Sequence, residues 1–230
     1  MLLVRRKDDK KIPGILAFAF IVISGMNTGA TAQEQVQMNV TMSKNVSSTG
    51  QTYGISFDLS NDALKSVSRI IIDGPRGPRI RLNNPLNFND IVLSAVNLSL
   101  DEFNSLFPEG DYKIDLVPSA FGKLKVHMTH NFPSTPALTY PLDGSVSVPT
   151  NPVITWAPIT GITSLQLQLT DNAGFVLSTN LPINATSYVV PANLLKTNTG
   201  YEVSLETNVT DFAGNVLNTT MSVSFTTGAQ

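Results

Sequence analysis

The segment DYKIDL, at residues 111–116, alternates charged and apolar side chains at every position. A period of two is that of a β-strand, whose successive side chains point to opposite faces of a sheet. The segment KLKVHMT at 123–129 repeats the pattern, and a short loop at 118–122 joins the two. The pair predicts a β-hairpin with one face in water and one face buried.

The rest of the first half shows the same period, with one exception. Ser99 and Glu102 have the spacing of a helix capping box, and Pro108 stops the pattern that follows. We therefore expect one short helix at about 99–106. The other predicted strands of this half are at residues 36–43, 53–59, 67–73 and 78–82.

A proline-rich, uncharged stretch at 132–136 divides the chain. The composition also changes there, since residues 137–230 contain a single cation, Lys196. We predict a first β domain over residues 33–133, a linker at 134–136 and a second domain at 137–230.

The second domain contains seven short predicted strands with turn signals between them. They lie at about 137–140, 152–157, 163–170, 174–179, 186–191, 200–208 and 220–227. Seven strands in about 90 residues are typical of a β-sandwich. The predicted fold class is all-β, with two β-sandwich-type domains in tandem and one short helix in the first.

Two segments of the second domain resemble the fibronectin type III family. VITW at 153–156 resembles the second strand of that family with its core Trp, and LKTNTGYEV at 195–203 resembles its approach to strand F. The resemblance implies that Tyr201 forms a tyrosine corner. Thr197 stands where the family usually has Pro. The ending at 209–227 also resembles bacterial Ig-like surface modules.

The whole chain resembles a group of exported bacterial proteins in which a β domain precedes a fibronectin-like one. The segments that carry this likeness, in order, are FPEGDY at 107–112, THNFP at 129–133 and PLDG at 141–144. The likeness implies architecture and export, and no activity.

The fibronectin-like end that most often binds partners implies two candidate loops, at 157–163 and 209–219. The candidate partner-binding residues are Ala157, Ile159, Thr160, Gly161, Asp211, Phe212, Gly214 and Asn215.

The N-terminus has the features of a secretory signal peptide. Five basic residues between Arg5 and Lys11 precede the apolar stretch 15–23, and Ala30-Thr31-Ala32 supplies the small residues of a cleavage site. We expect cleavage after Ala32 and a periplasmic or extracellular protein. The apolar stretch is too short for a span of about 20 residues, so no membrane span is expected after cleavage.

Residues 33–230 carry 10 Lys and Arg against 15 Asp and Glu, a net charge of −5. This balance argues against nucleic acid as a partner. The chain has no Cys, so no disulfide can form, and a bacterial exported protein is favoured.

No residue pattern predicts a cofactor, metal or catalytic centre. His127 and His130 are the only histidines, and we interpret them as a surface and a linker residue. Glu202 and Glu206 fall on the polar phase of their strand, opposite Tyr201, so we expect both carboxylates to face solvent. We expect no enzyme.

Arg76, Arg79 and Arg81 form the one local concentration of positive charge. They could bind a sulfated or acidic polymer, but we favour charges that keep a hairpin tip soluble and guard a sheet edge.

The chain contains one phrase twice, TDNAG at 170–174 and TDFAG at 210–214. We interpret both as turns in which the Asp oxygen accepts backbone amides and Gly takes a left-handed conformation. The strand order places them at opposite poles of the sandwich, so Asp171 and Asp211 cannot share one Ca²⁺.

These features predict an exported, non-catalytic binding or structural module of the bacterial envelope or extracellular space, with a protein or a polysaccharide as its partner. A carbohydrate-binding accessory or a polysaccharide-acting enzyme is the alternative.

Overall fold

The computed structural model describes residues 2–5, 36–76, 79–83, 90–119 and 122–229. Strands dominate, and the described residues hold one α-helix and one 3₁₀ helix, so the predicted all-β class is confirmed. The apolar stretch of the predicted signal peptide lies outside the described residues. None of the helices in the described part is long and apolar enough to cross a membrane.

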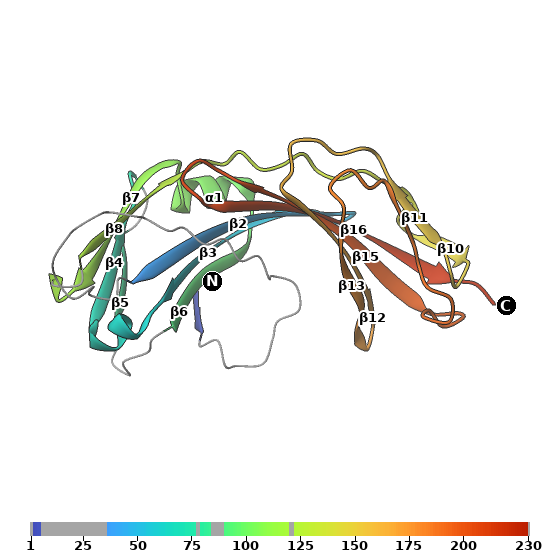
Figure 1. Cartoon of the computed structure of the whole chain (residues 1–230), viewed down its shortest axis with the longest axis horizontal. Helices are drawn as coiled ribbons and strands as arrows, with labels where there is room; N and C mark the ends of the chain where they lie inside the picture. The colour runs from blue at the N-terminus through green and yellow to red at the C-terminus, as the bar shows by residue number, and fades with distance from the viewer. Residues whose placement is uncertain (1, 6–35, 77–78, 84–89, 120–121, 230) are drawn as a thin grey trace. The chain divides into compact units, whose positions relative to one another are not determined.

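The chain divides into two compact units (Figure 1). Unit 1 comprises residues 1–42, 53–130 and 210–216. Unit 2 comprises residues 43–52, 131–209 and 217–230. The tip of one hairpin, 43–52, thus belongs to unit 2, and the turn at 210–216 belongs to unit 1. The linker at 134–136 stays a prediction.

Unit 1 contains a sheet of four strands in the order β5-β4-β7-β8. Their bounds are Ile80–Asn83, Arg69–Asp73, Gly110–Val117 and Lys123–Met128. β7 and β8 are antiparallel, with Asp115 opposite Lys123 and Asp111 opposite His127, so the predicted hairpin is confirmed.

The other strands of unit 1 follow the order β1-β6-β3-β2. Their bounds are Leu2–Arg5, Asp90–Leu98, Gly50–Ser60 and Gln37–Ser47. A short 3₁₀ helix, η1, spans Asp62–Ser66. β6 was not predicted, although Ile91, Leu93 and Ala95 are buried at alternate positions.

The helix α1 (Leu100–Leu106) begins with the predicted capping box. Ser99 Oγ accepts from the backbone N–H of Glu102, and Glu102 Oε2 accepts from the backbone N–H of Ser99, at 2.8 Å. These bonds satisfy two N–H groups that a helix start leaves free. The buried face of α1 presents Phe103, whose ring lies 5.6 Å from that of Tyr53 and 6.1 Å from that of Phe107.

Unit 2 is built from two sheets, and all seven predicted strands are present. One sheet has the order β14-β11-β9, with bounds Ser187–Val189, Val153–Trp156 and Leu138–Tyr140. The other has β16-β15-β12-β13, with bounds Val216–Thr227, Gly200–Thr210, Ser164–Asp171 and Gly174–Leu181. An unpredicted strand, β10 (Ser145–Val148), pairs with β16 in parallel.

The core of unit 2 has the two features that the fibronectin resemblance implies. Trp156 is buried, and its Nε1–H donates to the carbonyl of Ala185 at 2.8 Å. The hydroxyl of Tyr201 accepts the backbone N–H of Lys196 at 2.8 Å, which is the bond of a tyrosine corner. The predicted corner is confirmed.

We expect Tyr201→Phe to lower the free energy of unfolding by about 1–3 kcal/mol, because the Lys196 amide loses its acceptor. Urea unfolding followed by Trp156 fluorescence measures the change. Tyr140→Phe is the control, since Tyr140 is 37% exposed on β9 and should change stability by less than about 0.5 kcal/mol. Equal effects of the two substitutions would show that the corner bond contributes nothing.

Candidate functional site

The first predicted loop connects β11 to β12 and is tied to the scaffold at both ends. The backbone N–H of Ala157 donates to the Ala137 carbonyl at 2.9 Å, and that of Thr163 donates to the Asn208 carbonyl at 2.7 Å. Ile159 packs against the core, whereas Thr160 and Gly161 are exposed. The exposed part of the loop carries no charge and no aromatic ring.

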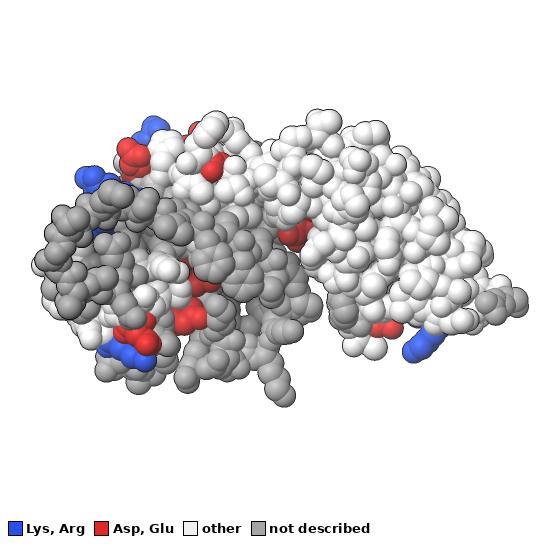
Figure 2. Space-filling model, viewed as in Figure 1, with Lys and Arg blue, Asp and Glu red and all other residues white. Residues whose placement is uncertain are grey.

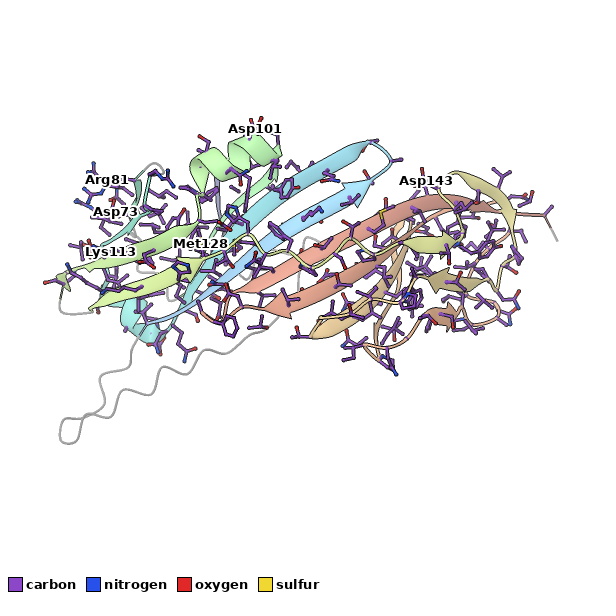
Figure 3. The ribbon with its side chains drawn as sticks, turned by 90° about the horizontal axis from the view of Figure 1, so that it is seen from above. Asp73, Arg81, Asp101, Lys113, Met128 and Asp143 are labelled. Atoms are coloured by element: carbon purple, nitrogen blue, oxygen red, sulfur yellow. The ribbon has the colours of Figure 1, made fainter. Side chains whose placement is uncertain are left out.

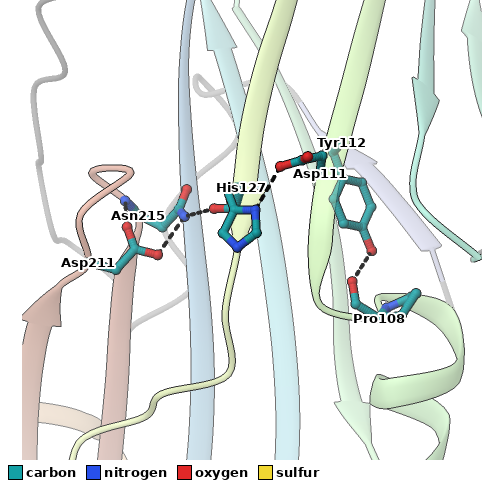
Figure 4. Close-up of polar contacts among 6 residues, drawn as sticks. All are labelled: Pro108, Asp111, Tyr112, His127, Asp211 and Asn215. Carbon is teal, nitrogen blue, oxygen red and sulfur yellow. Dashed lines mark hydrogen bonds and ion pairs between the residues drawn. The ribbon is translucent and has the colours of Figure 1, made fainter.

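The second predicted loop is a tight turn whose polar side chains bond within unit 1 (Figure 4). Asp211 Oδ1 accepts the backbone N–H groups of Ala213 and Asn215, both at 2.9 Å, as predicted. Gly214 has φ +83°, a left-handed conformation that favours glycine. The fully buried side chain of Asn215 donates to Asp211 Oδ2 at 2.7 Å and to the His127 carbonyl at 2.6 Å.

These bonds leave one candidate residue of the second loop free to meet a partner. Phe212 is fully exposed, while Asp211, Gly214 and Asn215 hold the turn. The two predicted loops are assigned to different units.

The first of the repeated turns also has the predicted bond, because Asp171 Oδ1 accepts the Ala173 N–H at 2.8 Å. Strand register pairs Asp171 with Tyr201 near the start of β15, whereas Asp211 follows the end of that strand. A groove of about 370 Å³ lies beside Asp171 and is also lined by Glu202 and Ser224. The rings that border it, Tyr201 and Phe225, are buried, so the groove offers carboxylates and hydroxyls without an exposed ring.

The prediction that both strand carboxylates face solvent is correct for Glu202 and wrong for Glu206. Glu206 is only 8% exposed, because β15 is buried on both faces from Leu205 to Asn208. Its Oε1 accepts from Asn208 Nδ2 at 3.1 Å. Burial raises the pKa of the Glu206 carboxyl, and the weaker effect of the Asn208 bond opposes this.

We expect Glu206→Gln to make the protein less sensitive to rising pH. A raised pKa means that the folded state holds the proton more tightly, so stability falls as pH rises above the unfolded value of about 4.3. Gln keeps an acceptor for Asn208 without a charge. Between pH 4 and pH 8, the melting temperature of Glu206→Gln should rise progressively relative to that of wild type. Glu202→Gln, which changes an exposed carboxylate, should show no such pH-dependent difference. A constant difference between wild type and Glu206→Gln at all pH values would contradict the assignment.

The two histidines have separate structural roles. His127 lies on the exposed face of β8, and its Nδ1 contacts Asp111 Oδ1 at 2.7 Å. His130 is half-buried, with its ring 4.8 Å from Phe103 and its Nε2 2.9 Å from the Phe107 carbonyl. Burial lowers the pKa of His130. No cluster of metal-ligating side chains occurs within the described ranges.

The predicted arginine patch is divided by an ion pair. The guanidinium of Arg79 donates through Nε and Nη2 to the two carboxylate oxygens of Asp73. This hydrogen bond is the largest effect on Asp73 and lowers the pKa of its carboxyl. Arg76 is exposed at the turn before β5, and Arg81 is exposed on that strand. Arg79 is therefore not free to bind an anion.

Strand register instead assembles a wider cationic face on the sheet β5-β4-β7-β8. Ile71 of β4 pairs with Arg81 of β5 and with Asp115 of β7, which in turn pairs with Lys123 of β8. Two residues further along, Asp73 of β4 pairs with Lys113 of β7, which pairs with Lys125 of β8. Arg79 is hydrogen-bonded to Asp73. Figure 3 shows Arg81, Asp73 and Lys113 together on one side of this sheet.

The alternate residues of these strands are buried or half-buried, so the charged side chains lie on the face that meets water. Its exposed cations are Arg69, Arg79, Arg81, Lys113, Lys123 and Lys125. They are six of the ten Lys and Arg of residues 33–230. On the face drawn in Figure 2, basic and acidic side chains lie beside one another over unit 1, whereas the visible surface of unit 2 is largely uncharged.

One pair on this face brings two like charges together, although Lys113 also has Asp73 opposite it on its other side. Lys113 and Lys125 stand directly opposite each other on neighbouring strands, and both are exposed. Like charges at that position are destabilising. The neighbouring pairs differ, because Lys123 Nζ lies 3.6 Å from the opposite charge of Asp115 and the His127 ring contacts the Asp111 carboxylate. An anionic group above the two lysines would relieve their repulsion.

Sequence reasoning identified the arginines and missed the lysines of this face. The sequence does place Lys113, Lys123 and Lys125 on the solvent-exposed face of the predicted hairpin. Their place beside Arg81 depends on the pairing of β4 with β7, which are distant in sequence.

No family model and no curated protein matches the chain. Among solved structures, a two-domain fibronectin type III segment of chicken tenascin shares 14% identity, covers 76% of this chain and 92% of its own, and has a TM-score of 0.31. The fibronectin(III)-like modules of Clostridium thermocellum CbhA share 13% identity, cover 82% and 94%, and have a TM-score of 0.30. Likenesses this distant carry no argument about function, which depends on the site itself.

Proposed function

We propose that this protein is an exported, non-catalytic binding module that holds an anionic polymer on the cationic face of unit 1. The observation that carries the proposal is the pair Lys113 and Lys125, two exposed like charges directly opposite each other, next to a pair of opposite charges, Asp115 and Lys123. A ligand that neutralises both converts an unfavourable pair into a favourable contact.

The charge distribution supports a polymer rather than a single small anion. The face offers cations on all four of its strands, at spacings of about 5 Å across strands and about 7 Å along them. Arg81, Lys113 and Lys125 make no ion pair with any other residue in the described segments. Each exposed contact contributes at most about 1 kcal/mol, so useful affinity requires several charges at once.

Binding of polygalacturonate, a carboxylated polysaccharide, to the full chain tests the proposal. The double variant Lys113→Ala/Lys125→Ala is expected to bind about tenfold more weakly, a loss of about 1.4 kcal/mol. The matched control is Lys65→Ala/Lys196→Ala, which removes the same charge from η1 and from unit 2. Equal losses in both double variants would show that net charge alone drives binding. Hydrolysis of the polymer, abolished by Glu202→Gln, would contradict the non-catalytic part.

A further inference from the structure

The cationic face ends at an edge strand that is hydrogen-bonded to a turn carrying an exposed aromatic ring. β8 is the edge strand of its sheet, and Asn215 Nδ2 donates to the carbonyl of His127 on that strand (Figure 4). His127 is two residues from Lys125, and Phe212 is three residues from Asn215. Chain length and this bond keep Phe212 within about 30 Å of Lys125.

The turn is built to hold its shape without a ligand. Asp211 accepts two backbone N–H groups and the Asn215 side chain, and Gly214 supplies the left-handed residue. Asn215 is fully buried, whereas Phe212 is the most exposed of the large apolar side chains of the described residues. A ring on a rigid support loses little conformational freedom when it binds, which is typical of residues that dominate an interface.

We infer that the ligand is an acidic polysaccharide, and that Phe212 supports the apolar face of a sugar ring while Lys125 and Lys113 bind its carboxylates or sulfates. This inference rests on the proposed anionic-polymer site and names the ligand class. An anionic polymer without rings would use the lysines alone, because a phosphate chain offers Phe212 no apolar surface. An acidic glycan uses both features.

Two probes separate the ring from the charges: polygalacturonate and long-chain inorganic polyphosphate, each titrated into the full chain. We expect Phe212→Ala to weaken polygalacturonate binding at least fivefold and to leave polyphosphate binding within twofold of wild type. Lys113→Ala/Lys125→Ala should weaken both about equally. Val189→Ala, which removes an exposed apolar side chain from unit 2, is the control.

The outcomes distinguish this inference from the function on which it rests. If Phe212→Ala changes neither affinity, or lowers both to the same extent, while the lysine variant loses both, the sugar platform is wrong and the anionic face stands. If wild type binds polyphosphate and not polygalacturonate, the ligand class is wrong. If the lysine variant binds both polymers as wild type does, the proposed function itself is contradicted.

Discussion

Lys125→Glu is expected to stabilise the protein and, at the same time, to weaken polygalacturonate binding by more than tenfold. Lys125 stands opposite Lys113 and two residues from both Lys123 and His127 on β8. A glutamate there would face an opposite charge across the strands, a change of about 0.2–1 kcal/mol in favour of the fold. It would also place a negative charge where the ligand's anion binds, and one reversed charge costs more than one removed.

Higher stability together with weaker binding is the result expected if Lys113 and Lys125 serve binding. A pair that served the fold would lose stability on the same substitution. Chemical denaturation measures the free energy of unfolding, and titration with the polymer measures affinity. The matched control is Lys65→Glu, because Lys65 is bonded to Asp62 at 2.6 Å and its reversal should lower stability slightly with little effect on binding. If Lys125→Glu destabilises the fold, the pair contributes to structure in a way that the register does not show.

Trp156→Ala is expected to lower the free energy of unfolding by about 3–5 kcal/mol. Trp156 is 3% exposed and lies in one core with Ile154, Leu167 and Tyr201. The substitution leaves a cavity and removes the donor to the Ala185 carbonyl. Since a domain is stable by about 5–15 kcal/mol in all, the substitution removes a large fraction of the stability of unit 2 and should lower its melting temperature clearly.

Circular dichroism during thermal unfolding measures this loss. Trp156→Phe keeps most of the apolar volume and gives up the N–H bond, so it should cost about 1–3 kcal/mol. A Trp156→Ala variant that melts within a few degrees of wild type would show that this core does not hold unit 2 together.

The alternation of polar and apolar residues predicted the all-β fold class. It gave wrong or missing predictions for strands that are buried on both faces or that carry apolar side chains on both faces. DYKIDL at 111–116 has one charged and one apolar face, so its strand could be read directly. β6 was missed because Val92 and Val96 add apolar side chains to the exposed face. Glu206 was misplaced because burial on both sides of β15 overrides the polar phase.

The candidate site could be predicted only in part. The arginines of 76–81 are close in sequence and were recognised, but the ion pair that occupies Arg79 was not. The lysines at 113 and 125 join Arg81 on one face only through the order β5-β4-β7-β8. One sequence does not specify strand order, because alternation sets which face a side chain occupies and not which strand lies next to it.

The salt dependence of polygalacturonate binding tests the central claim most directly. Exposed charges are screened over about 10 Å at 0.1 M salt, so binding by the cationic face must weaken steeply as NaCl rises from about 50 to about 300 mM. We expect a clear negative slope for wild type and a shallower slope for Lys113→Ala/Lys125→Ala, with Lys65→Ala/Lys196→Ala unchanged. Affinity that is independent of salt, or equal slopes in wild type and the Lys113 and Lys125 variant, would contradict the account.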